Sequence, residues 1–321
     1  MLIVMYHIDH EFFDYLAPNL NNALQAFILL MYYFISGIIF KLYEGFIDFT
    51  RRKVNNILVP FVFFIVLYFV VRCAEALFRL VIGAQPIDIN PIMLLEPFYL
   101  RAWEGTAPLW FLLSLFWVNI MFYALQRWVK PLWALLLVTV ALSIAGYALA
   151  AHKIQLPLMM DTSLVALPFF VLGWGMKRLG ALQPSRWDRL GVLALALSAI
   201  PVYLFSDFLN LHYQILPQYW KLYLLPSLAI LALFWACKSL SHVPLMCHYG
   251  QYSLIILGTH PLFFLQLRFL FTHYGFEPGV TLTLMVFALT MLLELPMIWF
   301  LKTFFPRFVA QKPFFKPGWK F

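Results

Sequence analysis

The fold is decided by the stretch PLWALLLVTVALSIAGYALAAH, which runs from Pro131 to His152 without a charged residue. A helix of about 20 mainly apolar residues is long enough to cross the hydrocarbon core of a bilayer. The rest of the chain has the same character, because 64% of its 321 residues are apolar and 11% are charged. A soluble domain is about half apolar and about a quarter charged. The composition therefore excludes a water-soluble globular protein.

Similar uncharged runs recur along the chain and predict nine membrane crossings. The run that ends at Leu267 contains Pro244 and Gly250, so its helix is expected to begin at about Ser253. The nine runs are Tyr15–Phe40, Val54–Val71, Gly105–Gln126, Pro131–His152, Thr162–Met176, Leu190–Ser206, Leu222–Cys237, Ser239–Leu267 and Pro278–Leu293. We therefore expect an all-α polytopic membrane protein.

The N-terminal segment differs from these runs. Met1–Ile8 is apolar but too short to cross a bilayer, and it leads directly into Asp9, His10 and Glu11. Two interpretations are open: the last two turns of a crossing whose first half precedes Met1, or a short interfacial helix. On the first interpretation the protein is a bundle of about ten transmembrane helices, the first one truncated at its N-terminus.

The distribution of charge predicts the orientation. The loops near 41–53, 126–131, 177–189 and 237–252, together with the tail from 302, hold 16 of the 22 Lys and Arg residues. The opposite loops hold nine of the 14 acidic residues. The positive-inside rule places the first set, and with it the C-terminus, in the cytoplasm. The net charge of +8 indicates contact with anionic membrane lipids and gives no reason to expect nucleic acid.

Ionisable groups in a membrane span are costly and are candidate functional groups. His7 and His10 share one helical face, but two possible ligands without a third are a weak metal signal. Before any resemblance is considered, histidines at an interfacial helix end are favoured over a catalytic role. Arg72 and Glu75 are expected to form an ion pair within their helix.

Other polar groups in the spans favour structural interpretations. Glu294 and Arg268 are expected near helix ends, where long side chains reach the interface. His260 precedes Pro261 in an apolar helix, where a lone histidine is more often a packing residue than a ligand. Ser36-Gly37 fits either close helix packing or a substrate contact.

The basic run Arg51-Arg52-Lys53 fits either a topology anchor or a phosphate site, since Arg binds phosphate with two parallel hydrogen bonds.

Five short segments occur in a distinctive order. They are Phe34-Ile35-Ser36-Gly37, the basic run followed by Ile57-Leu58-Val59-Pro60-Phe61, Pro108-Leu109-Trp110-Phe111-Leu112, Pro168-Phe169-Phe170-Val171-Leu172-Gly173, and Gly250-Gln251-Tyr252-Ser253-Leu254-Ile255-Ile256 before His260-Pro261-Leu262. This order resembles the membrane-bound acyltransferase 3 family over nearly the whole chain. The most similar members are O-antigen and exopolysaccharide O-acetyltransferases, fucose 4-O-acetylase-like proteins and glucan succinyltransferases.

The resemblance implies one integral-membrane acyltransferase domain over residues 1–321, in a bacterial inner membrane. It implies an O-acetyltransferase that uses acyl-CoA, with acetyl-CoA as the first choice of donor and no metal. The acceptor would be a hydroxyl of a carbohydrate or lipid-linked glycan of the cell envelope or exopolysaccharide.

The family's first helix carries a basic residue, ten arbitrary residues and then a histidine. His7 matches this histidine, and the basic residue would precede Met1, so we expect the native chain to begin about 15 residues earlier. The family has an Arg-x-x-Arg pattern, which corresponds to Lys53 and Asn56 here. The second basic residue of the pattern is therefore not kept in this chain. The family's His and Pro before Ser36 are Ile28 and Leu30 here.

The resemblance makes His7 the expected catalytic base, since the unperturbed pKa of histidine, about 6.5, suits proton transfer near neutral pH. Asp9 or Tyr6 would orient its ring, and an acyl-histidine intermediate remains an alternative. The CoA phosphates would bind Arg51, Arg52 and Lys53. The residues expected to line the substrate site or tunnel are Asp9, Ser36, Trp110, Tyr252, Ser253 and His260.

A different class of function is also compatible with the composition. A transporter or flippase for a lipid-linked glycan would need many apolar helices and few intramembrane charges. It would also be expected to contain paired broken helices around a midplane site, for which Pro226 and Pro296 are faint signals.

Overall fold

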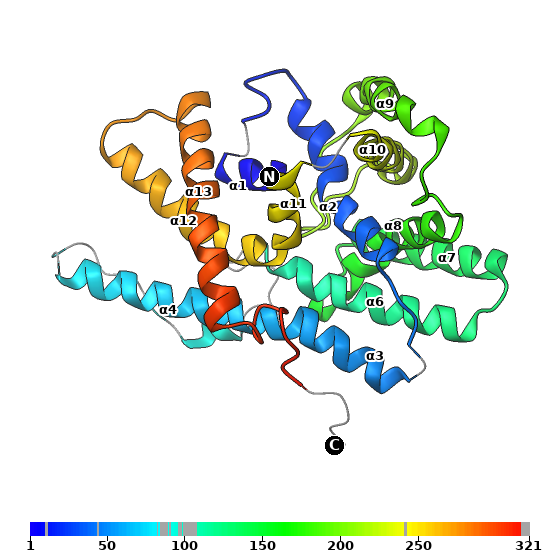
Figure 1. The fold of residues 1–321 in the computed structure, drawn as a ribbon, viewed down its shortest axis with the longest axis horizontal. Coiled ribbons are helices and arrows are strands. Elements are labelled where there is room, and N and C mark those ends of the chain that lie inside the picture. Colours follow the sequence, from blue (N-terminus) through cyan, green and yellow to red (C-terminus); the bar gives the residue numbers. More distant parts are fainter. Residues whose placement is uncertain are drawn as a thin grey trace. The chain divides into compact units, whose positions relative to one another are not determined.

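The computed structural model describes residues 1–9, 12–43, 45–81, 83, 89, 91–95, 98, 108–240 and 243–315. Regular structure in these residues is helical, apart from one isolated β-bridge between Asn210 and Ile215. The expectation of an all-α protein is therefore confirmed (Figure 1).

Eight helices in the described residues are long and apolar enough to cross a membrane. These spans are Leu20–Ile38, Phe46–Val81, Leu132–Ala151, Pro157–Arg178, Arg186–Phe205, Tyr219–Ser239, Ser253–His273 and Val280–Phe304. They correspond to eight of the nine expected crossings. The remaining one lies on helix α6 (Trp110–Trp128), whose apolar run is interrupted by Asn119, Gln126 and Arg127.

The chain divides into two compact units, and the boundary between them falls within α6 and within α11 (Pro244–Gln251). The first unit contains α1 (Leu2–Ile8), α2 (Leu20–Ile38), α7 (Leu132–Ala151), α8 (Met160–Arg178), the 3₁₀ turn η4 (Arg186–Leu190), α9 (Gly191–Phe205) and α10 (Tyr219–Ser239). The second contains α3 (Phe46–Lys53), the π-helical turn η1 (Val54–Leu58), α4 (Val59–Val81), the 3₁₀ turns η2 (Pro91–Leu94) and η3 (Pro157–Met159), α12 (Ser253–His273) and α13 (Val280–Phe304).

In the first unit, glycines allow two helices to pack at backbone contact distance. A Cβ atom on Gly37 of α2 would collide with the carbonyl oxygen of Phe170 on α8. A Cβ on Gly173 of α8 would collide with the carbonyl oxygen of Phe34 on α2. Small residues permit this approach in a membrane, where van der Waals packing drives helix association. Two of the five segments quoted above therefore meet each other.

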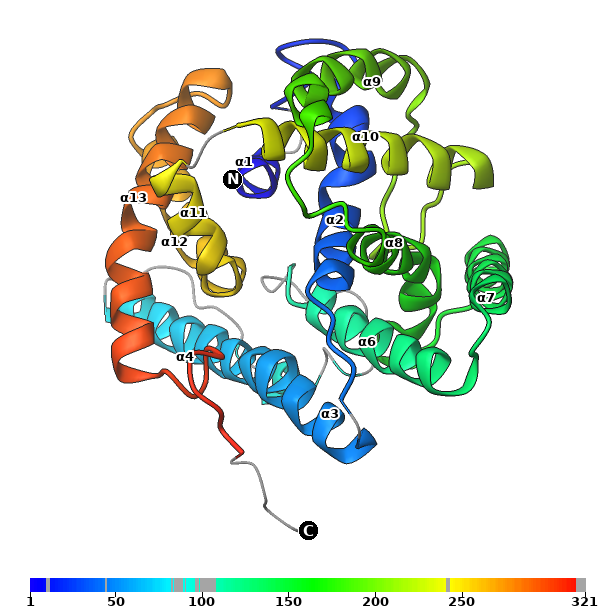
Figure 2. The same ribbon diagram turned by 45° about the vertical axis from the view of Figure 1, so that its right-hand side comes forward.

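Helices α9 and α10 also pack side by side in the first unit, as both ribbon views show (Figure 1, Figure 2). Here Gly191 lies against the backbone of Trp235, where a Cβ atom would collide with the Trp235 carbonyl oxygen. The 3₁₀ turn η4 precedes α9 and also packs on α10. This arrangement brings the connections before and after α9 to the two ends of α10.

In the second unit, α12 packs against both α4 and α13. A Cβ on Gly258 of α12 would meet the ring of Phe64 on α4 at 2.5 Å. The helix before α12 ends at Gln251, and the backbone of Tyr252 leaves helical geometry at φ −104°, ψ 21°. The expected start of the long helix at Ser253 is therefore confirmed, although the preceding connector is itself helical.

Candidate active site

His7, the expected catalytic base, lies in the last turn of α1, and its side chain is half-buried. Val4 and Ile8 lie one turn apart on this helix, and both are buried. The helix packs against α2. The ring of Tyr6 lies 5.8 Å from the imidazole ring, centroid to centroid, at an angle of 53°. The packing of α1 thus holds His7 in a defined place.

Asp9 follows the end of α1 in an extended conformation and is buried. Its backbone N–H donates a hydrogen bond to the carbonyl oxygen of Met5 at 3.2 Å, which caps the short helix. His10, the expected partner of His7 on one helical face, lies outside the described residues.

Ser36 lies in the last turns of α2 and is buried. It immediately precedes Gly37, where α2 makes its closest approach to α8. The close packing predicted for this pair is therefore confirmed for Gly37. The proposed substrate contact of Ser36 stays a prediction.

The basic run forms the last turn of α3 and leads into the π-helical turn η1. Arg51 lies 3.6 Å from the Asp48 carboxylate. The exposed Arg52 guanidinium is 4.5 Å from the ring centroid of Tyr43. Lys53 Nζ is 5.4 Å from the ring centroid of Phe49. The helix continues without a break from Phe46 to Val81, and π-helical turns such as η1 frequently occur at functional sites. The segment is thus an ordered, positively charged stretch of helix that could receive an anionic group.

The Asn55 side chain fastens this turn to the C-terminal tail. Its Nδ2 donates to the carbonyl oxygen of Phe315 at 3.0 Å, and its Oδ1 accepts from the Phe315 N–H at 2.8 Å. Phe308 of the tail stacks on Phe63 of α4, with ring centroids 5.4 Å apart. The basic run therefore precedes a turn that is braced from a distant part of the sequence.

Tyr252 and Ser253 lie where α12 begins. Tyr252 is buried, and Lys302 of α13 donates a long hydrogen bond of 3.5 Å to its hydroxyl oxygen. Ser253 is exposed. Trp110 opens α6, where it is half-buried and lies 6.5 Å from the ring of Phe111.

His260 is fully buried in α12 and lies beside a proline. Its Nδ1 is 2.7 Å from the carbonyl oxygen of Ile256, one turn earlier. Pro261 has no N–H, so the helix lacks the hydrogen bond that would otherwise reach the carbonyl of Leu257. A histidine bonded to its own helix is compatible with the packing role predicted above.

The expected site residues are distributed over the two units. His7, Asp9 and Ser36 belong to the first unit. The second unit contains Arg51, Arg52, Lys53, Trp110, Tyr252, Ser253 and His260. Within the second unit, Tyr252, Ser253 and His260 are brought together by α12 and its N-cap.

Glu294 corrects one prediction. It was expected near a helix end, where its carboxylate would reach the interface, but it lies in the middle of α13 with none of its surface exposed. Thr259 Oγ1 lies 2.9 and 2.7 Å from its two carboxyl oxygens. The signal was present in the sequence, because a carboxyl group inside an apolar run must find a polar partner in the protein.

A second prediction about charges in the spans is also wrong. Glu75 pairs with Arg79, at 2.8 Å and one turn later, rather than with Arg72. Arg72 Nε is buried and has no hydrogen-bond partner within the described residues. Spacings of three and four residues both bring side chains together on a helix, so sequence spacing could not choose between the two arginines.

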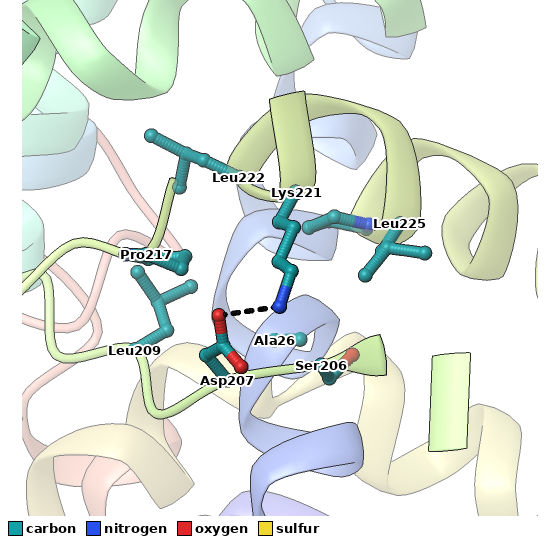
Figure 3. A pocket seen from close by; sticks show the side chains of 9 residues that line it. Ala26, Ser206, Asp207, Leu209, Pro217, Lys221, Leu222 and Leu225 are labelled. Carbon is teal, nitrogen blue, oxygen red and sulfur yellow. Dashed lines mark hydrogen bonds and ion pairs between the residues drawn. The ribbon is translucent and has the colours of Figure 1, made fainter. Parts of the chain in front are cut away.

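A polar hollow that the sequence did not indicate lies in the first unit, between α2 and the connection from α9 to α10 (Figure 3). Its enclosed part has room for about one water-sized group, and the rest of its roughly 200 Å³ of empty space is open to solvent. Its polar groups are Ser206, Asp207 and Lys221, and Lys221 Nζ lies 2.8 Å from Asp207 Oδ2. The apolar lining consists of Ala26, Leu209, Pro217, Leu222, Leu225 and Pro226. We call this feature the Lys221 pocket.

Comparison with known proteins identifies one family. A sequence model of an acyltransferase domain matches residues 1–299, a range that includes His7, the basic run and the Lys221 pocket. Searches of curated proteins and of solved structures found no match.

Proposed function

The chain belongs to the acyltransferase 3 family, and we propose that it transfers an acyl group from cytoplasmic acyl-CoA to a hydroxyl group of a carbohydrate. The observation that carries this proposal is the match to an acyltransferase domain over residues 1–299. We propose acetyl as the acyl group and a polysaccharide or lipid-linked glycan of the bacterial cell envelope as the acceptor. The enzyme would act in the inner membrane, with its C-terminus in the cytoplasm.

The proposed reaction exchanges one acyl bond for another. The acceptor oxygen attacks the thioester carbonyl carbon, the new C–O bond forms and the C–S bond to CoA breaks. His7 takes the proton of the attacking hydroxyl, and the departing sulfur of CoA takes up a proton. A positioned base of this kind typically accelerates proton transfer about 10²–10⁴-fold. The half-buried position of His7 beside Tyr6 supports this role.

The basic run is the proposed site for the phosphates of CoA. Arg51, Arg52 and Lys53 follow one another in the last turn of α3, on the side that the charge distribution assigns to the cytoplasm. Arg52 is exposed, and its guanidinium can form paired hydrogen bonds to a phosphate. The CoA donor would then arrive from the side on which it is made.

The two prolines that favoured the competing transporter hypothesis do not break their helices. Pro226 and Pro296 were the faint indications of broken helices, but α10 and α13 each continue through their proline. Neither helix supplies the pair of half-helix ends around which such transporters build a midplane site.

The experiment measures acyl-CoA consumption by purified protein in lipid nanodiscs, with methyl α-D-glucopyranoside present as the acceptor. Acetyl-CoA and succinyl-CoA are supplied in parallel, and release of free thiol is the readout. Wild-type protein should consume one of the two donors, and His7→Ala should reduce the rate at least about 100-fold, because the base is lost. His152→Ala is the control, since this exposed histidine at the end of α7 has no proposed role. Full activity in His7→Ala would remove the proposed base, and no consumption of either donor by the wild type would overturn the function.

The same assay tests the CoA site. Changing both Arg51 and Arg52 to Glu should raise the KM for the donor at least about tenfold, since the phosphates would face like charges. Arg189→Glu changes charge on the same expected side of the membrane and should leave this KM unchanged. An unchanged KM in the double variant would show that the basic run does not bind CoA and would favour a role in membrane orientation alone.

A further inference from the structure

The Lys221 pocket contains a cation whose hydrogen-bonding capacity the protein leaves largely unused. The Lys221 ammonium group has three N–H donors. One of them reaches Asp207 Oδ2 at 2.8 Å, and the ammonium lies 5.8 Å from the ring centroid of Trp220. No other acceptor for it occurs within the described residues. Two donors therefore point to water or to a ligand.

A second polar group in the same pocket lacks a partner. The Ser206 hydroxyl oxygen is buried and makes no hydrogen bond with any described residue. A buried hydroxyl group without a partner is destabilising, and such groups are uncommon in folded proteins. A hydroxyl that both donates and accepts would satisfy it. Ser206 and Lys221 thus leave complementary hydrogen-bonding capacity in one place (Figure 3).

The position of Lys221 is also electrostatically unfavourable. It lies in the first turn of α10, which begins at Tyr219, and the positive end of a helix dipole disfavours a cation there. Asp207 offsets this charge, but its side chain is 48% exposed, so water weakens the compensation. A lysine that is placed against the helix dipole and left with unused donors is poorly explained by a contribution to stability.

The charges select the class of ligand. An anion attracted by Lys221 would meet the Asp207 carboxylate, and a cation attracted by Asp207 would meet the Lys221 ammonium group. A neutral polyhydroxylated ligand suits both, because its hydroxyls accept from Lys221 and donate to Asp207. The apolar wall, which includes Leu209 and Pro217, suits the C–H groups of a sugar ring.

We propose that the Lys221 pocket binds the hydroxyl-bearing edge of the carbohydrate acceptor. The charge distribution assigns this loop to the side opposite the basic run, so the acceptor would bind on the extracytoplasmic face. The assignment of this ligand as the acceptor rests on the proposed acyl transfer, whereas binding of a neutral sugar at this place does not depend on it.

The test measures sugar binding directly. Wild-type protein in lipid nanodiscs is examined by saturation-transfer-difference NMR with methyl α-D-glucopyranoside as the probe. Lys221→Met and Asp207→Asn should each reduce the sugar signal at least about fivefold, and Ser206→Ala should reduce it by about half, since each loss removes a charged or a neutral hydrogen bond. Lys153→Met is the matched control, because this exposed lysine lies at the end of α7, on the same expected side.

The outcomes separate the pocket from the proposed enzyme. Equal sugar signals in Lys221→Met and wild type would overturn the pocket assignment, as would displacement of the sugar by inorganic phosphate, which would indicate an anion site. Acyl-CoA consumption is measured on the same preparations. Sugar binding without any consumption would overturn the acyl transfer but leave the sugar site standing. Consumption with an acceptor KM unchanged in Asp207→Asn would overturn the pocket but leave the enzyme standing.

Discussion

Helix α10 carries one lysine near each end, and each lysine is paired with an aspartate from the segment on one side of α9. At the C-terminal end, Lys238 Nζ lies 2.9 Å from Asp188 and 2.8 Å from each of the carbonyl oxygens of Ala181 and Gln183. All three of its donors are therefore used, and the helix dipole favours its charge. At the N-terminal end, Lys221 has one such acceptor and opposes the dipole.

The difference shows how the same pair of residue types can serve two purposes. The Lys238 end is saturated by the protein, so it fastens α10 to the loop before α9 and leaves nothing for a ligand. The Lys221 end is unsaturated, so it stabilises the fold less and remains available for binding. This comparison predicts that substitutions at saturated polar groups lower stability, and that substitutions at unsaturated ones change function.

The largest effect on stability is expected at the saturated end. Lys238→Met keeps the apolar stem of the side chain but removes the three hydrogen bonds that the charged ammonium group donates. We expect the midpoint of thermal unfolding to fall by roughly 6 °C, because hydrogen bonds to charged groups contribute more than neutral ones. Scanning fluorimetry of the protein in nanodiscs measures this shift. An unfolding midpoint equal to that of the wild type would contradict the view that the saturated Lys238 end stabilises the fold.

A smaller loss is expected at a saturated group in the second unit. Thr259→Val preserves the shape of the side chain but leaves the buried Glu294 carboxyl group without its hydroxyl partner. The unfolding midpoint should fall by about 4 °C, since an unsatisfied buried polar group is costly. Thr272→Val on the same helix is the control, because Thr272 is exposed and bonds the Arg268 carbonyl oxygen. Equal shifts in the two variants would contradict the prediction.

The smallest effect comes from exchanging the two charges at the unsaturated end. The double variant Asp207→Lys with Lys221→Asp keeps the ion pair but places the negative charge in the first turn of α10. The dipole then favours the pair by about 0.3–1 kcal/mol, so the unfolding midpoint should stay constant or rise by up to about 2 °C. The corresponding exchange of Asp188 and Lys238 should lower it, because a carboxylate cannot donate to carbonyl oxygens. A comparable fall at both ends would show that the two ends are equivalent.

Much of the fold could be predicted from the sequence because membrane insertion depends on consecutive residues. The run Pro131–His152 predicted a crossing, and the structure contains α7 (Leu132–Ala151) there. Pro244 and Gly250 before Ser253 correctly indicated the start of α12. The seven-residue helix α1 is compatible with both interpretations of the N-terminal segment, so its relation to the membrane stays a prediction.

The candidate site was less accessible to sequence reasoning. His7 and the basic run were predicted from local pattern and family resemblance, and their roles stay predictions. Glu294 was misplaced because its burial depends on Thr259, which another helix supplies. The Lys221 pocket was missed because Ala26 is remote in sequence from Ser206, Asp207 and Lys221, and the helices must pack before these residues form one surface.

The sequence by itself determined that this protein spans a membrane and belongs to a family of acyltransferases, because apolar length and short ordered motifs are properties of neighbouring residues. Which polar groups are saturated was decided by the tertiary structure alone. The sequence does not distinguish the hydrogen bonding of the two lysines near the ends of α10. Folding places the carbonyl groups of Ala181 and Gln183 within hydrogen-bond distance of Lys238. No carbonyl group of the described chain lies within hydrogen-bond distance of Lys221. Hydrogen bonds are short and directional, so their completion depends on helix packing rather than on composition.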